Sequence, residues 1–346
     1  MNRPTVIDIA REAGVSLATV DRVLNARPGV RAKTIAAVNE AIGRLGYVRD
    51  IAAANLARSR SYRMVVLLPD TESQFVQTLE EALREAAASA VTARMGVELI
   101  RFAAEDMHAL AATLRRLAEE GCSGIALMAP ETPVIRDALR ALRGQGVPVV
   151  ALVSDLPNSE PDHYVGIDSR AAGRTAGVLM GRFLGARPPK VMVIANSMHL
   201  RESIERRRGF DEVMLRDFPG VEVLQTLETH GSPTALRQVV TEILAAEGTV
   251  GGIYLLGSGL RALGRVLSER GLLGHPVIVG HELTPHSREA LASGWLDAVI
   301  AQNAGHIARS TLRVLRAKAD RLPIDESQER LRIEIILREN LPDQPL

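Results

Sequence analysis

Residues 5–47 read TVIDIAREAGVSLATVDRVLNARPGVRAKTIAAVNEAIGRLGY. Apolar residues recur in this stretch at helical spacing, and no alternating strand pattern is present, which predicts short helices. Thr5 can cap the first helix, and Asp8 three residues later completes a pair like a capping box. We expect two more helices, over about 17–24 and about 32–45.

A helix, a tight turn at Gly14 and a second helix together form a helix-turn-helix. Gly14 tolerates the positive φ that the turn needs, and Ser16 can cap the helix that follows. The second helix of such a motif fits the major groove of DNA. The pattern alone is weak evidence for DNA binding, because an ordinary three-helix surface module has the same features.

The composition predicts a protein with two or three domains and aliphatic cores. The chain has 346 residues, of which 46% are hydrophobic and 3% are aromatic. Its single cysteine, Cys122, fits a reducing compartment, and we expect a buried, inert thiol. No apolar signal segment is visible, and no apolar run reaches the roughly 20 residues of a membrane span. We therefore expect a cytoplasmic protein without a membrane partner.

Charge is distributed unevenly along the chain. Residues 1–63 contain 11 Lys and Arg against 5 Asp and Glu, whereas the remainder contains 31 against 36. A basic end on a mildly acidic body favours a polyanionic partner for that end only. Residues 47–63, YVRDIAAANLARSRSYR, are rich in Ala and Arg and lack a strand signal. We interpret them as a linker that can be helical in its middle.

From Met64 onward, short β-rich runs alternate with amphipathic helical stretches. Examples of the runs are MVVLLP, GIALMA, KVMVIA and PVIVGH. This alternation predicts parallel sheets with helices on both faces. Two series of strands are separated by the segment SDLPNSEPDHYVGID, which indicates two similar α/β lobes. Within that segment Asp168 follows a short strand, and we expect it to cap the next helix.

The string from Thr5 to Tyr47 resembles the DNA-binding headpiece of the lac-repressor (LacI/GalR) family of bacterial transcription regulators. The matching features are AGVS, TVxRVLN, the spacing of Val30 and Thr34, and LGY. Leu56, nine residues after Tyr47, matches the leucine of the family's hinge helix. The remainder resembles the family's ligand-sensing core, which is related to periplasmic sugar-binding proteins.

The resemblance implies an all-α helix-turn-helix headpiece followed by an α/β two-lobe core like a periplasmic binding protein. We expect the headpiece over 1–46, a hinge-helix linker over 47–63, and a ligand-binding and dimerisation core over 64–346. By the same resemblance the chain crosses between lobes near 164, near Ser293 to Trp295, and near Leu322 and Pro323. Lobe 1 then comprises about 64–163 and 295–322, and lobe 2 about 164–294 and 323–346.

The resemblance also implies roles for residues of the headpiece. Leu17, Ala18 and Arg22 match base-reading positions; Arg22 can donate two hydrogen bonds to guanine, and the other two offer apolar contact or are helix-surface residues only. Leu56 would wedge into the minor groove, or pack within the hinge helix. Phosphate or backbone positioning is expected of four residues, namely Ser16, Thr19, Asn25 and Arg31. Thr5 and Ser16 can equally be helix caps and no more.

Asp21 departs from the family's pattern, which usually has Ser at this position. A carboxylate near phosphates is repelled, so few roles are open to it. It could accept a hydrogen bond from a cytosine amino group, or hold Arg22 or another nearby arginine in a reading pose. It could also be a surface carboxylate that weakens nonspecific binding to DNA.

Candidates for ligand binding lie where strands end, since the carboxyl ends of parallel strands share one edge of a sheet. Glu282 follows PVIVGH where relatives place an acidic contact, and Gln302 follows LDAVIA where they place a glutamine. Arg206 matches the ligand-anchoring arginine, although a surface arginine is the alternative. Ser258 replaces a residue that is often Asn, which puts the usual hydrogen bond there in doubt.

Two further candidates precede the middle of the chain. Phe75 matches an aromatic residue that stacks on the ligand ring, or is a core residue at the start of a helix. Asp155 could accept hydrogen bonds from ligand hydroxyls, or cap a turn before Pro157.

The sequence therefore predicts a ligand-responsive transcription regulator, most simply a repressor. It would bind a near-palindromic operator in double-stranded DNA as a homodimer and sense a sugar or polyol between its lobes. Histidines at metal-ligand spacing and a nucleophile motif are missing, so we expect no metal, no cofactor and no catalysis. The alternatives are a solute-binding protein of a transporter and an α/β sugar-metabolising enzyme with an added helical module.

Overall fold

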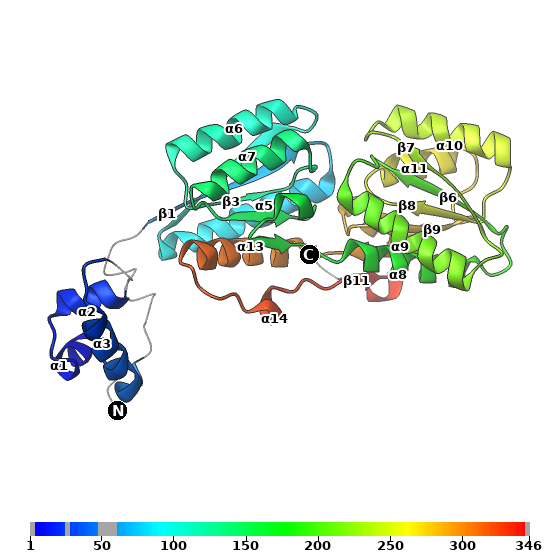
Figure 1. The fold of residues 1–346 in the computed structure, drawn as a ribbon. Helices are drawn as coiled ribbons and strands as arrows, with labels where there is room; N and C mark the ends of the chain where they lie inside the picture. The colour runs from blue at the N-terminus through cyan, green and yellow to red at the C-terminus, as the bar shows by residue number, and fades with distance from the viewer. Residues whose placement is uncertain (1–3, 25–27, 48–60, 343–346) are drawn as a thin grey trace. The chain divides into compact units, whose positions relative to one another are not determined.

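The computed structural model describes residues 4–24, 28–47 and 61–342, and the chain divides into two compact units, Met1–Arg60 and Ser61–Leu346. The described part of the first unit contains helices α1 (Val6–Glu12), α2 (Leu17–Leu24) and α3 (Ala32–Leu45) (Figure 1). Thr5 caps α1 in a capping box with Asp8, and Gly14 has a φ of 63° in the turn. The three helices lie where the periodicity predicts them.

The first unit has a small hydrophobic core. Its fully buried members come from all three helices: Ile9, Ala10, Val20, Val38 and Ala41. Ile35 follows the same helical spacing, yet its side chain is 39% exposed, because the inward face of α3 is centred on Val38 and Ala41. With so few buried side chains, the loss of any one removes a large part of this core.

The second unit begins with a lobe built on a parallel sheet of order β2-β1-β3-β4-β5, here called the first lobe. Its strands are β1 (Tyr62–Asp70), β2 (Met95–Ala103), β3 (Gly124–Leu127), β4 (Val149–Leu152) and β5 (His163–Val165). Helices α5 (Gln74–Ala90) and α13 (Ala304–Ala319) cover one face, and α6 (Met107–Glu120) and α7 (Pro133–Gly144) cover the other. Alternate residues of β1 face the two layers, which explains its continuous apolar run.

The second lobe is built on a sheet of order β11-β10-β9-β8-β6-β7, parallel except for β11. Its strands are β6 (Lys190–Ala195), β7 (Glu222–Glu228), β8 (Gly252–Leu255), β9 (Val277–His281), β10 (Ala298–Ala301) and β11 (Glu334–Ile336). Helices α8 (Ser169–Leu184) and α9 (Arg201–Asp217) pack on one face, and α10 (Pro233–Glu247), α11 (Leu260–Glu269) and α12 (Pro285–Ala292) on the other. Shorter helices are η1 (Val91–Ala93), η2 (Pro157–Ser159), α14 (Glu326–Glu329) and η3 (Arg338–Asn340).

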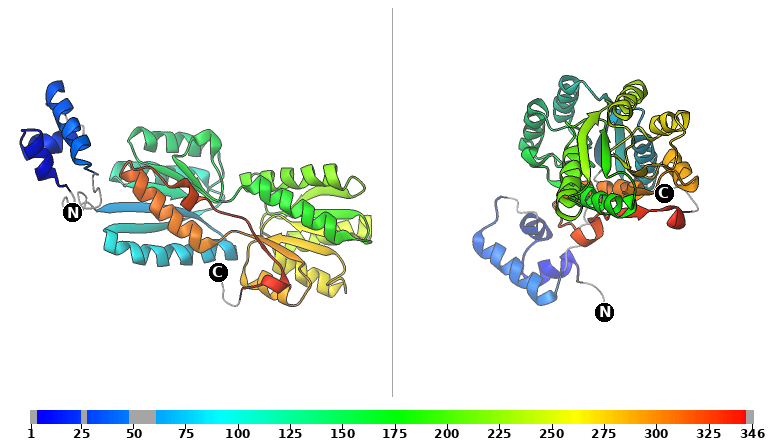
Figure 2. Two further views of the ribbon diagram at one scale, coloured as in Figure 1. Left: turned by 90° about the horizontal axis from the view of Figure 1, so that it is seen from below. Right: turned by 90° about the vertical axis from the view of Figure 1, so that its right-hand side faces the viewer.

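The chain passes between the lobes at three places (Figure 2). The first passage, at 166–168, lies close to its expected position. The second lies at 302–303 instead of near Ser293 to Trp295, because β10 still pairs with β9 in the second lobe. The third lies between α14 and β11 instead of near Leu322 and Pro323, because Glu329 of α14 accepts a hydrogen bond from Arg313 of α13 at 2.8 Å.

The linker is also shorter than expected at its far end. Tyr62 and Arg63 were expected within it, but both belong to β1 and pair with Met95 and Gly96 of β2. Tyr62 is buried, and its hydroxyl donates to Asp320 Oδ1 at 2.6 Å. The expected hinge helix and its Leu56 lie outside the described residues, as does Asn25.

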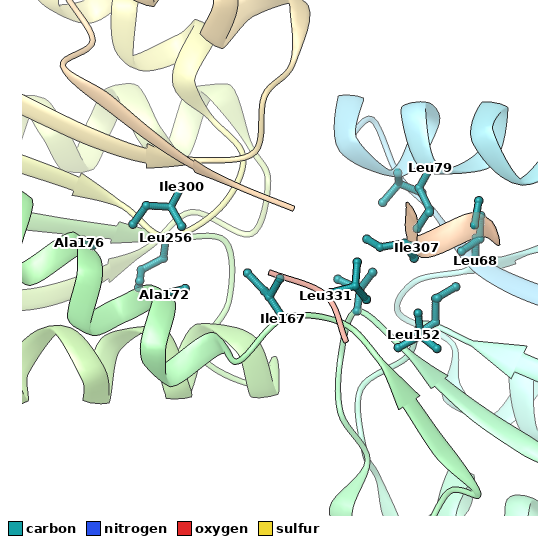
Figure 3. Packing of buried hydrophobic residues seen from close by; sticks show 14 of the residues in the cluster. Leu68, Leu79, Leu152, Ile167, Ala172, Ala176, Leu256, Ile300, Ile307 and Leu331 are labelled. Atoms are coloured by element: carbon teal, nitrogen blue, oxygen red, sulfur yellow. The ribbon is translucent and has the colours of Figure 1, made fainter. Parts of the chain in front are cut away.

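One hydrophobic cluster continues from one lobe to the other. Figure 3 shows Ile167 and Leu331 on the connecting segments, between buried residues of the two lobes such as Leu152 and Leu256. The connecting segments are therefore packed, so any change in the closure of the lobes would require adjustment around them. Within the described residues, no helix is both long and apolar enough to cross a membrane.

The two lobes repeat one topology down to details of the backbone. Val153 directly after β4 and Glu282 directly after β9 both have a positive φ, of 62° and 68°. Asp162 accepts from the N–H of Val149 at 2.8 Å, as Asp297 accepts from that of Ile278 at 2.7 Å. Each carboxylate holds the start of the penultimate parallel strand of its sheet. Glu282 therefore occupies the position in the second lobe that Val153 occupies in the first.

Candidate functional site

Polar side chains gather at the carboxyl ends of the strands of the second lobe. Asn196 follows β6, Ser258 lies three residues after β8, Glu282 follows β9 and Gln302 follows β10. Neighbouring parallel strands end at one edge of the sheet, so these residues converge there. The Nδ2 atom of Asn196 donates to Ser258 Oγ at 2.6 Å.

Arg206, Glu282 and Gln302 form one buried hydrogen-bonded network. Arg206 Nη2 donates to Glu282 Oε1 at 3.1 Å, and Gln302 Nε2 donates to the same oxygen at 3.0 Å. Arg206 Nη1 donates to the carbonyl oxygen of Leu256 at 2.8 Å. The three residues are 4%, 9% and 4% exposed, so the surface alternative for Arg206 is excluded.

Two glycines bring Arg206 to this network. A Cβ atom on Gly173 of α8 would lie 2.0 Å from the carbonyl oxygen of Arg206, and one on Gly209 would lie 2.0 Å from that of Arg170. Such distances are far below van der Waals contact, so only glycine permits this approach of α8 and α9. This close approach buries the face of α9 that packs against α8, and it turns Arg206 toward the strand ends.

Several buried polar atoms of this cluster lack a hydrogen-bond partner among the described residues. They are Asn196 Oδ1, Arg206 Nε, His281 Nδ1, Glu282 Oε2 and Gln302 Oε1. An unpaired buried polar atom costs about 1–3 kcal/mol, and native proteins contain few of them. Their concentration at one sheet edge indicates a site for a small polar ligand.

Glu282 is held in a conformation that an L-residue seldom adopts. Its φ of 68° lies in the left-handed region, which costs of order 1–3 kcal/mol for a residue other than glycine. Burial raises the pKa of its carboxyl group, while the charge of Arg206 and the hydrogen bond from Gln302 lower it. The strain and the desolvation are both typical of a residue kept for binding.

An aromatic layer supports the network from below. The Tyr254 hydroxyl lies 2.8 Å from His281 Nε2, and the Tyr254 ring stacks on Phe210 with centroids 4.5 Å apart. Tyr254 and Phe210 are fully buried and His281 is nearly so. His281 precedes Glu282 directly, so this layer fixes the strand end that carries Glu282.

We expect His281 to make the stability of the second unit depend on pH. Burial, with a contribution from the positive charge of Arg206, holds the pKa of His281 well below its usual 6.5. Below that pH the unfolded chain takes up a proton that the folded chain does not, so stability is present above pH 6.5 and lost as the pH falls. We expect a loss of about 1.4 kcal/mol per pH unit from this residue.

Urea unfolding of the full chain at about pH 7 and about pH 5.5 measures this loss. The His281→Gln variant should lose less free energy of unfolding on acidification than the natural protein. His199→Gln, at an exposed histidine, is the control. An unchanged pH dependence in His281→Gln would contradict the assignment.

The first lobe contributes less to this site. Ser154 Oγ donates to Glu202 Oε2 at 2.6 Å, a buried hydrogen bond that connects the two lobes. The carboxylate of Asp155 accepts from the N–H of Leu156 at 2.8 Å, which is the turn-capping role. Phe75, the second residue of α5, is half-buried and packs against the hydrophobic cluster, which is the core role. Asp168 caps α8, accepting from the N–H of Ala171 at 2.8 Å.

Of the six residues proposed from the sequence, the structure links Arg206, Glu282 and Gln302 by direct hydrogen bonds. Ser258 lies at the same strand edge, where it accepts a hydrogen bond from Asn196. The sequence interpretation missed Asn196 and Glu202 as site residues. The position of Asn196 directly after a predicted strand could have identified it, whereas nothing in the sequence shows that Glu202 is buried.

Two surface grooves of the second unit lie away from this cluster. One, of about 460 Å³, runs between α5 and α13 and is lined by residues such as Ala86, Leu312 and Arg309. The other, of about 240 Å³, lies beside α11 and α12 and includes Trp295. Neither contains any of the unpartnered buried atoms, so neither is our candidate for the ligand.

In the first unit, α2 presents an exposed face suited to DNA. Leu17, Ala18 and Arg22 are exposed on it, while Val20 is buried beneath. Ser16 caps the helix, since its Oγ accepts from the N–H of Thr19 at 3.2 Å, and the two hydroxyl oxygens lie 2.9 Å apart. Arg31 is exposed and Asp21 is half-buried. This arrangement leaves the proposed base-reading side chains accessible.

Both modules match known protein families. Residues 64–321 match the family described as periplasmic binding protein domain. Residues 5–50 match the bacterial regulatory proteins of the lacI family. The chain belongs to the periplasmic binding protein domain family and carries a lacI-family domain at its N-terminus. The expected resemblance and fold class are thereby confirmed.

A part of the chain is similar to curated proteins named Catabolite control protein A. Catabolite control protein A of Priestia megaterium is 40% identical over 83 residues, which is 24% of this chain and 25% of that protein. The same values hold for Catabolite control protein A of Staphylococcus aureus (strain N315). The chain thus aligns with about a quarter of the length of the curated relatives it matches.

The periplasmic binding protein domain is similar to solved structures of sugar-binding proteins. GanP, a glucose-galactose binding protein from Geobacillus stearothermophilus, has a TM-score of 0.73 at 18% identity, covering 82% of this chain and 99% of that one. A solute binding protein from Burkholderia graminis C4D1M in complex with D-arabinose has a TM-score of 0.73 at 19% identity, covering 82% and 98%. At these identities the likeness shows the fold.

Proposed function

We propose that this protein is a ligand-responsive, DNA-binding transcription regulator that acts as a repressor. The observation that carries the proposal is the union, in one chain, of a lacI-family domain with a two-lobe core whose strand ends hold a buried polar cluster. The exposed face of α2 would read the major groove, with Arg22 on a guanine. Such a protein would act in the cytoplasm, where it meets DNA.

The sensed ligand in this proposal is a sugar or polyol. The buried carboxylate, amide and guanidinium groups of Glu282, Gln302 and Arg206 suit hydroxyl groups, which both donate and accept hydrogen bonds. The similar structures named for glucose-galactose and bound to D-arabinose favour the same class. Ligand binding would change lobe closure, and operator affinity with it; thermodynamics then requires that the operator change ligand affinity by the same factor.

We also propose a homodimer. A helix-turn-helix contacts one half-site, and two copies on a near-palindromic operator contact both. Light scattering of the full chain, with and without DNA, measures this state. A monomer that binds a single half-site would contradict it.

The test of the regulator is selection of DNA from a random pool by the full chain, followed by titration of the selected sequence in the presence of sugars and polyols. A regulator enriches one palindrome-like sequence, and one ligand changes its affinity. A solute-binding protein would bind a sugar without enriching DNA. An enzyme would convert the sugar that it binds. A regulator should leave the sugar unchanged when the two are incubated together.

Asp21 offers a test inside the DNA-binding module. Replacing Asp21 with Ser removes a negative charge from the helix that would face phosphates. We expect nonspecific DNA affinity at low salt to rise by about three- to tenfold and operator preference to relax. Fluorescence anisotropy with the selected sequence and a scrambled one measures both.

Glu40→Ser is the matched control. It makes the same change of charge on α3, where the side chain is 69% exposed and pairs with Arg44. We expect it to leave operator preference unchanged. If Asp21→Ser shifted binding to operator and scrambled DNA equally, the specificity role of Asp21 would be wrong.

A further inference from the structure

Glu202 places a second carboxylate within the cluster at the strand ends. It lies in the first turn of α9, is 8% exposed, and accepts a hydrogen bond from Ser154 of the other lobe at 2.6 Å. Among the described residues no arginine or lysine forms a salt bridge with it, in contrast to Glu282. The cluster therefore holds two buried carboxylates and one buried guanidinium.

The position of Glu202 in α9 gives its charge a definite place. The first turn of a 17-residue helix attracts negative charge, because its N–H groups are unpaired and the helix dipole is positive there. The residue before the helix, Leu200, supplies no side-chain cap. Glu202 is the acidic residue of this turn, so the chain itself provides the anion that the helix end favours.

The surrounding charges are also mainly negative. Tyr164 is within the influence of the charges of Glu202 and Arg206, and its hydroxyl donates to the carbonyl oxygens of Val153 and Ile167. Burial is the main cause that raises the pKa of Tyr164, the charges of Glu202 and Asp155 raise it further, and Arg206 opposes them. An anionic group entering here would meet more carboxylates than cations.

We propose that Glu202 is a charge-selectivity residue that restricts the ligand of this site to uncharged, hydroxyl-rich molecules. The unpartnered buried atoms agree with this class: Asn196 Oδ1, Glu282 Oε2 and Gln302 Oε1 are acceptors that need donors, while Arg206 Nε is a donor that needs an acceptor. A hydroxyl group can serve both kinds of atom. Sugar phosphates and sugar acids also carry hydroxyl groups, but they add a negative charge that the carboxylates of Glu202 and Glu282 would repel. This inference rests on the proposed function as a sugar or polyol sensor.

The experiment is a calorimetric titration of the full chain with matched sets of probes. Each set comprises a neutral aldose, its phosphate ester and its aldonic or uronic acid; glucose, galactose, ribose, xylose and arabinose supply the sets. The natural protein should bind its best neutral sugar about 100-fold more tightly than the charged derivatives, as expected for like charges brought together in a buried site. The Glu202→Gln variant should reduce that ratio to about tenfold or less.

Glu205→Gln is the control, because it removes the same charge from the same helix. Glu205 pairs with Arg201 and Arg208, outside the cluster. Its selectivity should equal that of the natural protein. A phosphate or acid that binds the natural protein as tightly as its neutral parent would overturn the proposal, with no variant needed. A protein that binds no sugar of any kind would instead refute the proposed sugar sensing.

Discussion

Replacing Arg206 with leucine should weaken ligand binding by about 100-fold or more, the largest effect that we expect of any single change in the core. Arg206 would donate to the ligand through Nε while Nη2 holds Glu282. Replacing Arg206 removes a hydrogen-bond donor from the site. It also leaves the buried carboxylate of Glu282 without its positively charged partner. Calorimetric titration with the best neutral sugar measures the loss.

Stability separates two causes of this loss. Breaking one partner of a buried pair costs about 3–5 kcal/mol, whereas replacing both by apolar residues is often neutral. The double variant Arg206→Leu, Glu282→Leu should therefore recover part of the free energy of unfolding without recovering binding. If binding returned with stability, Arg206 would be a structural residue and not a ligand contact.

Arg207→Leu is the control for Arg206. The neighbouring side chain is half-buried, but it turns away to Asp211 and Thr226, with Nε 2.8 Å from Asp211. It should lower stability and leave the dissociation constant for the sugar unchanged. A large effect on binding would show that α9 as a whole, and not Arg206, sets the affinity.

Replacing Ile9 with alanine should abolish DNA binding and leave the second unit intact. Ile9 is fully buried in the five-residue core of the first unit. Such a substitution costs about 2–5 kcal/mol, comparable with the whole stability of a module of this size. Because the second unit has its own cores, its melting transition and its sugar affinity should be unchanged.

Ile7→Ala provides the comparison, since its side chain is 56% exposed on the same helix. It makes the identical chemical change and should retain DNA binding within about threefold, as surface substitutions usually do. Fluorescence anisotropy with the selected DNA measures both variants, and calorimetry follows the second unit. Equal losses in the two variants would show that α1 contacts DNA and that burial is not the cause.

Local patterns predicted the helices of the headpiece and most strands of the core. The apolar periodicity and the capping residues that define such an element lie within a few residues of one another in the sequence. The passage expected near Ser293 was misplaced for a different reason. The run LDAVIA shows a strand, but only the pairing of β10 with β9 shows to which sheet it belongs. The assignment of Tyr62 to the linker failed likewise, since only its pairing with Met95 shows that it belongs to β1.

The residues of the candidate site also fall into two groups, those that local patterns predict and those whose place depends on tertiary packing. Glu282 and Gln302 followed from the rule that ligands meet strand ends, and Asn196 could have been found by it. Arg206 came only from resemblance, because its place depends on the crossing of α8 and α9 at Gly173 and Gly209. Glu202 could not be anticipated, since its partner Ser154 lies 48 residues away in the other lobe.

The repeated topology of the lobes has a kinetic consequence. At equivalent strand ends, one lobe carries valine at Val153 and the other carries glutamate at Glu282. The second lobe thus contains the hydrogen-bonded network of Arg206, Glu282 and Gln302, and the first lobe contributes Ser154 and apolar residues. We therefore expect a ligand to bind the second lobe first, and the first lobe to slow its escape afterwards. This expected order follows from one difference, valine against glutamate, between two otherwise similar lobes.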